Sequence, residues 1–285
     1  MRFDRLKDGV KMKNKYTGTL FDLSSEVALV TGGLGQLGSQ FSLALSEAGA
    51  RVVIIDIASS TKNNKLREAL SSGEIKLVKA DITKKSDLIE AAKKISREIG
   101  TPTVLVNNAA IDSPPDAPVG GNGPFESYPE RSWDGVMEAN LKSIFLTCQV
   151  FGGIMAKSKR GSIINISSIY GMVSPNQGIY EYRRKTGEEF YKPIAYSVSK
   201  SGIYNLTRYL ATYWAKKGVR VNTLTLAGVF NNQDKQFIEN YYSIIPIGRM
   251  ANEDEYNGAI LFLASGASKY MTGSNLIVDG GWTAI

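Results

Sequence analysis

The sequence contains no histidine and only one cysteine. Without histidine, the 285-residue chain has no Ser-His-Asp triad, no histidine-ligated metal and no histidine acid–base chemistry. Proton transfer therefore falls to tyrosine, lysine, a carboxylate or the thiol. The lone Cys148 excludes an internal disulfide and is typical of a reducing compartment. We expect a cytoplasmic protein with no metal site.

Long hydrophobic runs are also missing. No apolar stretch approaches the ~20 residues that a membrane span requires. The charged N-terminus has no apolar segment after it, which argues against a secretory signal. The length is that of one large α/β domain with a well-buried core.

The formal net charge is +7, which raises the question of nucleic-acid binding. The first fifteen residues hold six lysines and arginines against two aspartates, so they carry +4 of this net charge, in a segment without apolar periodicity. We interpret residues 1–19 as a basic, mobile N-terminal extension and residues 20–285 as a single folded domain. We expect neither nucleic acid nor membrane as a partner.

Short, mostly β-branched apolar runs alternate with helical patterns along the chain. The runs are Val27–Thr31, Arg51–Asp56, Ile75–Asp81, Thr103–Ala109, Ser162–Ser168, Val219–Thr225 and Asn275–Gly281. Nearly continuous apolar runs are typical of strands buried on both faces, and strand–helix alternation implies right-handed crossovers. The predicted fold is α/β, with a single Rossmann-type, doubly wound parallel sheet of about seven strands flanked by helices.

The first predicted strand runs into a helix through the glycine-rich turn TGGLGQLG. Gly32 permits a tight turn, Gly35 lets backbone approach a pyrophosphate, and Gly38 lets the helix pack closely on the strand. Asp56, at the end of the second predicted strand, can bond both ribose hydroxyls and would repel a 2′-phosphate. Since no arginine or lysine directly follows Asp56, the pattern favours NAD over NADP. A helix-capping role for Asp56 is the structural alternative.

Tyr196 and Lys200, in YSVSK, stand one helical turn apart on one face. A phenol with an ordinary pKa of ~10 is a poor base, but an ammonium at i+4 favours the phenolate. The pair can therefore do the acid–base work that histidine does elsewhere. A second pair at this spacing, Tyr213 and Lys217, lies ~25 Å further along the helix and is interpreted as ordinary surface.

Two more polar residues complete the candidate site. Ser168 ends a predicted strand, where its hydroxyl can bond a substrate oxygen, and Asn140 lies within an otherwise amphipathic helix. Taken singly, each is explained as structural: a turn serine, and an asparagine bonded to backbone. In combination with Tyr196 and Lys200, a catalytic role is favoured.

In order and approximate spacing, the segments TGGLGQLG, NNAA, SSIYG, YSVSK, RVN and VDGG resemble those of the short-chain dehydrogenases/reductases, over about residues 20–285. The resemblance implies an oxidoreductase that interconverts a secondary alcohol and a ketone. It also implies an Asn–Ser–Tyr–Lys tetrad. Tyr196 would be the general acid–base, and Ser168 would orient the substrate oxygen. Lys200 would bind the nicotinamide ribose and lower the tyrosine pKa, and Asn140 would hold a water in a proton relay.

The resemblance also implies cofactor contacts along a cleft, with Asp81 beside adenine. The expected cofactor-binding residues are Gly32, Gly35, Gln36, Leu37, Gly38, Asp56, Ile57, Asp81, Ile82, Asn108, Ala109, Ala110, Tyr196, Lys200 and Val229. The glycine loop follows the family's extended branch, whereas NNAA, RVN, VDGG and the chain length resemble the compact branch. We interpret the chain as compact-branch with an extended-type glycine loop.

An insertion at about residues 175–193 lengthens the gap between Ser168 and Tyr196. Its aromatic and basic residues suit a ring-bearing anion such as a phosphorylated or nucleotide-linked sugar, and we expect Ser168, Tyr182, Arg183 and Tyr191 to bind the substrate. The alternative is a solvated loop whose charges balance internally. The insertion and glycine loop are also similar to those of oxidoreductases of surface-sugar or flagellin modification.

Other functions stay open. A 3-oxoacyl-[acyl-carrier-protein] reductase would share the fold and typically use NADPH. An epimerase with retained NAD, and a non-catalytic NAD-binding sensor or scaffold, are further alternatives. The expected partner is a small-molecule substrate, and the resemblance implies a homo-oligomer, a tetramer or dimer, built through the long helices that contain Asn140 and Tyr196.

Overall fold

The apolar runs form one fully parallel sheet. The structure, a computed structural model, describes residues 19–112 and 123–285. Its strands are β1 Val27–Thr31, β2 Arg51–Asp56, β3 Ile75–Lys79, β4 Val104–Asn107, β5 Gly161–Ser168, β6 Val219–Leu226 and β7 Asn275–Val278. Their spatial order is β3-β2-β1-β4-β5-β6-β7, with every neighbouring pair parallel. This confirms the predicted doubly wound α/β fold, whose strand order reverses between β1 and β4.

Three strands end earlier than the apolar runs predict. β4 stops at Asn107 because the next two N–H groups, those of Asn108 and Ala109, donate to the Thr31 hydroxyl rather than to a neighbouring strand. β3 stops at Lys79 because the chain turns at Asp81, whose carboxylate accepts the Thr83 N–H at 3.0 Å. β7 stops at Val278, since Gly280 and Gly281 that follow have φ of +63° and +86°, outside the range of a strand. Apart from Thr19, the predicted N-terminal extension lies outside the described residues.

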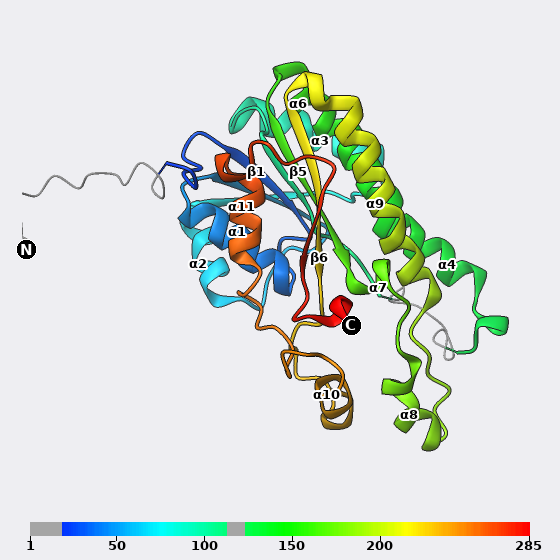
Figure 1. Ribbon diagram of the computed structural model, residues 1–285. Helices are drawn as coiled ribbons and strands as arrows, with labels where there is room; N and C mark the ends of the chain where they lie inside the picture. The colour runs from blue at the N-terminus through cyan, green and yellow to red at the C-terminus, as the bar shows by residue number, and fades with distance from the viewer. Residues whose placement is uncertain (1–18, 113–122) are drawn as a thin grey trace, which may run out of the picture.

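Helices cover both faces of the sheet (Figure 1). The α-helices are α1 Gln36–Glu47, α2 Asn64–Ser72, α3 Lys85–Glu98, α4 Glu130–Met137, α5 Ser143–Thr147, α6 Gly153–Ser158, α7 Ile169–Met172, α8 Glu181–Lys185, α9 Ile194–Trp214, α10 Lys235–Tyr242 and α11 Asn257–Ala264. Two π-helical segments, η2 Glu138–Lys142 and η3 Cys148–Gly152, join α4, α5 and α6. Short 3₁₀ turns are η1 Phe125–Ser127, η4 Gln177–Tyr180, η5 Ala215–Lys217, η6 Gly266–Ser268 and η7 Trp282–Ala284.

Each buried strand contributes side chains to two hydrophobic cores, one on each face of the sheet, because alternate side chains point to opposite faces. In β1, Ala28 and Val30 pack in the core that contains Phe41 of α1, with α2 and α11 on the same face. Leu29 packs in the other core, which contains Leu88 of α3 as well as side chains of α9. This arrangement explains why the strand sequences lack polar alternation.

The fold holds the carboxyl ends of all seven strands at one edge of the sheet. At that edge, α8 and α10 extend beyond the sheet, as Figure 1 shows. Among the described residues, no helix has the length and apolar character needed to cross a membrane.

Close packing at Gly152, in η3, allows a test of how η3 packs against α9. A Cβ at Gly152 would lie 2.5 Å from the Trp214 ring of α9, whereas one at Gly258, in α11, would have nothing within 4 Å. We expect Gly152→Ala to lower the free energy of unfolding by about 1–3 kcal/mol through overpacking. Gly258→Ala should leave it unchanged or raise it by up to about 1 kcal/mol. Urea unfolding measures both, and equal effects would contradict this packing.

Candidate active site

The glycine turn between β1 and α1 is shaped by close contacts at some glycines and by open space at another. Gly32 has φ +61°, and a Cβ there would lie 2.8 Å from the Ala109 backbone. A Cβ at Gly38 would lie 2.2 Å from the Gly32 carbonyl oxygen. At Gly35, the nearest atom is that same oxygen at 3.4 Å. The fold itself therefore requires Gly32 and Gly38, while Gly35 keeps space free in the cavity that it lines.

The N-terminus of α1 opens into this cavity. Gly35 is its N-cap and supplies no side-chain hydrogen bond, and the first helical residues Gln36, Leu37 and Gly38 line the cavity. The first N–H groups of a helix lack intrahelical partners and attract anions. The residues therefore fit the pyrophosphate of a dinucleotide.

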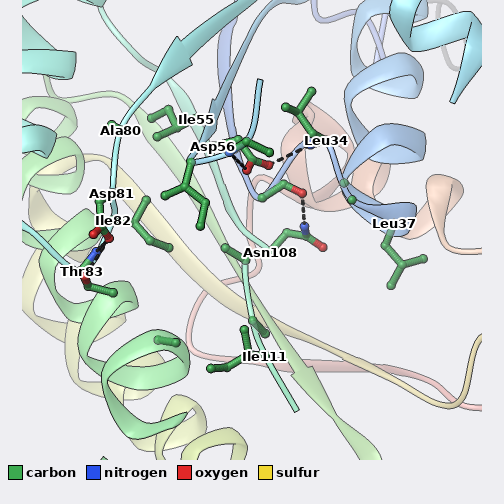
Figure 2. A pocket seen from close by; sticks show the side chains of 18 of the residues that line it. Leu34, Leu37, Ile55, Asp56, Ala80, Asp81, Ile82, Thr83, Asn108 and Ile111 are labelled. Carbon is green, nitrogen blue, oxygen red and sulfur yellow. Dashed lines mark hydrogen bonds between the residues drawn. The ribbon is translucent and has the colours of Figure 1, made fainter. Parts of the chain in front are cut away.

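One end of the cleft, where the adenosine of a cofactor is predicted to bind, is a cavity of about 610 Å³ (Figure 2). Its lining includes the predicted cofactor residues Gly32, Gly35, Gln36, Leu37, Gly38, Asp56, Ile57, Asp81, Ile82, Asn108, Ala109 and Ala110. Asp56 is fixed by the backbone: its carboxylate accepts the N–H groups of Leu34 at 3.1 Å and Ala58 at 2.9 Å. Within the described part of the chain, this lining includes no lysine or arginine.

Asp81 faces the same cavity. Burial raises the pKa of its carboxyl, but hydrogen bonds from Thr83 and the nearby Lys84 ammonium outweigh this, so the pKa lies below its ordinary value. The group is therefore ionised and can accept a hydrogen bond from a ligand.

Thr31 fixes the spacing of the cleft walls, a role that the sequence analysis missed. Its hydroxyl accepts the N–H groups of Asn108 at 3.0 Å and Ala109 at 3.2 Å. In return, the Asn108 amide donates to the carbonyl oxygens of Thr31 and Gly32, both at 3.1 Å. These bonds join the ends of β1 and β4, the point where the strand order reverses and where such sheets bind ligands.

The other end of the cleft is a second cavity, of about 360 Å³, which we call the catalytic end because predicted catalytic residues line it. Gln36, Leu37, Asn108 and Ala110 line both cavities, so the two ends form one cleft. Four more of the residues predicted to bind cofactor or substrate line this end. They are Ser168, Tyr196, Lys200 and Val229. The predicted tyrosine, serine and lysine are therefore brought together, beside the predicted cofactor residues.

Burial sets the ionisation of the Tyr196–Lys200 pair. It raises the pKa of Tyr196 to about 12, with Asp112 acting in the same direction and a hydrogen bond with Ser168 opposing it. Burial also lowers the pKa of Lys200 to about 8. The Lys200 ammonium donates to the Ile166 carbonyl oxygen at 3.1 Å and lies 5.8 Å from the centroid of the Tyr196 ring. The cleft by itself thus favours the neutral phenol.

Asn140 lies in the π-helical segment η2, a type of helix that often occurs at functional sites. Its side chain is fully buried: Oδ1 accepts the Ile111 N–H at 2.8 Å, and Nδ2 donates to the Ile111 carbonyl oxygen at 2.8 Å and to Ser199 Oγ at 3.2 Å. Asn140 therefore ties the segment after β4 to α9, beside Tyr196. These hydrogen bonds of the side-chain amide are all made to other groups of the protein.

The insertion forms a wall of the catalytic cavity rather than a loose loop. Tyr180 stacks on Phe237 of α10 with ring centroids 5.4 Å apart, and both line the cavity. The Tyr182 hydroxyl donates to Asp234 at 2.5 Å, while Arg183 pairs with Glu188. The stacked rings and the Tyr182–Asp234 hydrogen bond join the insertion to α10, while the Arg183–Glu188 pair lies within the insertion.

Three residues expected to bind substrate are not brought into the cavity. Tyr182, Arg183 and Tyr191 lie outside its lining, because their side chains bond or pack within the insertion and against its neighbours; Arg184 lies over the Tyr191 ring. Lining residues that the sequence analysis did not assign to the substrate site are Tyr170, Tyr180, Lys192, Gln233, Phe237 and Tyr241. Tyr170 lies in the SSIYG motif, while the other five belong to no motif, so only the tertiary fold identifies those five.

Comparison with known proteins now gives the class. The family model described as enoyl-(acyl carrier protein) reductase matches residues 35–283. The chain belongs to the short-chain dehydrogenase/reductase family. It is an oxidoreductase that acts on alcohol or ketone groups with a nicotinamide cofactor.

Several relatives share most of the chain. The NAD-dependent glycerol dehydrogenase of Listeria innocua serovar 6a is 30% identical, over 92% of this chain and 96% of its own. The acetoacetyl-CoA reductase of Allochromatium vinosum is 33% identical, over 90% and 98%.

Solved structures show the same fold. A short-chain dehydrogenase from Leptospira borgpetersenii with bound NAD⁺ is 32% identical with a TM-score of 0.78, covering 90% of this chain and 92% of its own. A gluconate 5-dehydrogenase from Burkholderia cenocepacia in complex with NADP and tartrate is 25% identical with a TM-score of 0.78, covering 93% and 99%.

The buried lysine should make stability depend on pH. Because folding lowers the pKa of Lys200 from 10.5 to about 8, the folded state binds fewer protons than the unfolded state between these values, and stability rises with pH there. We expect Lys200→Met to be more stable than the wild type at pH 7, by up to about 3 kcal/mol. The advantage should shrink as pH approaches 10.5. Urea unfolding at several pH values measures it, and a pH-independent difference would contradict the burial cost.

Proposed function

We propose that this enzyme oxidises a secondary alcohol on a small polyol or sugar derivative with NAD⁺, and reduces the ketone in reverse. The observation that carries the proposal is the position of Ser168, Tyr196 and Lys200 at one end of a cleft whose other end presents Asp56. We propose the predicted tetrad and cofactor residues as the site.

In the proposed mechanism, Ser168 and Tyr196 hold the substrate oxygen and Tyr196 moves its proton. The cofactor, when bound, accepts or supplies the hydride. For oxidation, the Tyr196 phenolate takes the hydroxyl proton; for reduction, the phenol returns a proton to the forming alkoxide. Lys200, one turn along α9, supplies positive charge that favours the phenolate. Asn140 positions the backbone next to α9.

NAD is the proposed cofactor because the Asp56 carboxylate would repel a 2′-phosphate and suits the ribose hydroxyls. The carboxylate is held by the Leu34 and Ala58 N–H groups. No lysine or arginine in the described lining could neutralise a phosphate. One similar enzyme is named NAD-dependent and another was solved with NADP, so membership of the family does not determine which of the two cofactors this chain uses.

The substrate class follows from the size and polarity of the catalytic cavity. About 360 Å³ must hold the reacting carbon and the nicotinamide ring, which favours a small polyol or sugar derivative, including a phosphorylated one, over a nucleotide-linked sugar. A glycerol dehydrogenase among the relatives supports the same class.

A 3-oxoacyl ketoreductase is the second candidate. The similarity to an acetoacetyl-CoA reductase favours it, and Tyr180, Phe237 and Tyr241 give the cavity an aromatic wall. NADPH-dependent reduction of an acyl thioester, without activity on polyols, would establish it.

We also propose a homo-oligomer, a tetramer or dimer, built through the long helices. Phe145, Tyr209 and Tyr213 are 48%, 64% and 59% exposed on α5 and α9. Exposed aromatic side chains gathered on one helical layer favour burial against a second copy.

Tyr196→Phe tests the proposed mechanism. Removal of the hydroxyl removes the proton acceptor, so kcat for alcohol oxidation with saturating NAD⁺ should fall about 10²- to 10⁴-fold. In the wild type, oxidation should accelerate as pH rises, because burial raises the tyrosine pKa and oxidation needs the phenolate. NADH absorbance at 340 nm measures both. Near-normal turnover of the variant would refute the mechanism.

Asp56→Asn tests the proposed cofactor. The amide keeps one oxygen to accept a backbone N–H but removes the charge that repels a 2′-phosphate. The ratio of kcat/KM with NAD⁺ to that with NADP⁺ should fall at least about tenfold, or 1.4 kcal/mol. Asp81→Asn, on the neighbouring strand end, is the matched control and should leave the ratio nearly unchanged. A wild-type preference for NADP⁺ would overturn the NAD proposal.

A further inference from the structure

Lys192 brings an ammonium group to the catalytic end of the cleft. It lines the cavity with Ser168 and Tyr196, and its side chain is only 16% exposed. The ammonium lies 4.9 Å from the centroid of the Tyr196 ring and 5.9 Å from that of Tyr170. It is therefore next to the proposed reacting group, although it belongs to the insertion and to no motif.

The backbone at Lys192 is held in place. Its N–H donates to Gln177 Oε1 at 2.9 Å, and the Gln177 amide donates to its carbonyl oxygen at 3.3 Å. Pro193 follows as the N-cap of α9, which carries Tyr196. The position of Lys192 relative to Tyr196 is thus set by the fold rather than by a flexible loop.

The partner of Lys192 within the protein is a half-exposed carboxylate. The Lys192 ammonium pairs with Asp112 at 2.6 Å, but the Asp112 side chain is 49% exposed. An ion pair open to solvent on one side is weak, so an anion that enters the cavity can take the place of Asp112.

The charge of the cavity favours an anion. Among the described residues that line the catalytic end, the charged ones are Lys192 and Lys200, and the nearby Asp112 carboxylate, which pairs with Lys192, is not part of the lining. Lys200 is 3% exposed and already donates to the Ile166 carbonyl oxygen. Lys192 is therefore the cation that a substrate anion would reach, by displacing the Asp112 carboxylate. Lysine binds carboxylate and phosphate as a point charge with three donors.

We propose that Lys192 determines substrate specificity by binding an anionic group, a carboxylate or phosphate, on the substrate whose hydroxyl faces Tyr196. The substrate is then an acidic polyol or sugar derivative rather than a neutral one. This inference rests on the proposed function and narrows its substrate class.

The test uses three probes with the same six-carbon chain: sorbitol, gluconate and sorbitol 6-phosphate. For each, kcat/KM is measured with NAD⁺ for the wild type, Lys192→Met and Lys192→Arg. We expect the wild type to prefer at least one anion. Lys192→Met should lower the ratio of anionic to neutral kcat/KM about 10- to 100-fold, the effect of one charged hydrogen bond. Lys192→Arg should keep the ratio within a few-fold.

The ratio separates specificity from effects on Tyr196. Removal of a cation beside Tyr196 changes its pKa, but this affects neutral and anionic probes alike and cancels in the ratio. Asp112→Asn should affect anion binding in the direction opposite to Lys192→Met. It removes the carboxylate that pairs with Lys192, so KM for the preferred anion should fall. The preferred probe, gluconate or the phosphate ester, identifies which anion the site takes.

Several results would overturn the inference. An unchanged ratio in Lys192→Met with active enzyme would remove Lys192 from substrate recognition, while the proposed polyol oxidation would stand. A rise only in the KM for NAD⁺ would assign Lys192 to the cofactor. If no probe is oxidised, the proposed function fails by itself. The inference is then tested by calorimetric binding of gluconate and inorganic phosphate to wild type and Lys192→Met with NAD⁺ present, and equal binding would end it.

Discussion

The burial of Tyr196 beside Lys200 is the constraint on which the site depends. Dehydration raises the pKa of the phenol to about 12 and lowers that of the ammonium to about 8, so the cleft by itself disfavours the charged forms of both groups. In a chain without histidine, such a pair can supply the proton transfer. The positive charge of an oxidised nicotinamide beside the phenol would shift the balance toward the phenolate, which would make the proposed base available when the cofactor is bound.

The surroundings of this pair keep it in place. Asn140 joins the segment after β4 to α9, and Ser167 Oγ donates to the Lys200 carbonyl oxygen at 2.9 Å. The glycine turn is tied to the segment after β6 by the Gln36 amide, which donates to the Phe230 carbonyl oxygen at 2.8 Å. The insertion and α10 then close one side through the stacked Tyr180 and Phe237 rings. The edge of the sheet, α9 and the insertion thus all contribute residues to the lining of one cavity.

Periodicity and spacing predicted the sheet because its five inner strands are buried on both faces, and β1 and β2 begin and end where their apolar runs do. The YSVSK spacing predicted the Tyr196–Lys200 pair because both lie on one turn of α9. The partners of Arg183 and Tyr182 were not predictable, since Glu188 is a local choice among several carboxylates and Asp234 lies on a distant segment. Lys192 was missed as a lining residue because its place depends on how the insertion folds back.

The most direct test of this account is the ionisation of Tyr196 itself. ¹³C NMR of ring-labelled tyrosine follows it, with the resonance assigned by its loss in Tyr196→Phe. Without cofactor, the pKa of Tyr196 should lie near the value of about 12 that burial imposes, and saturating NAD⁺ should lower it toward the working pH. An ordinary pKa near ~10 that NAD⁺ leaves unchanged would contradict the account, because neither burial nor the bound cation would then control the base.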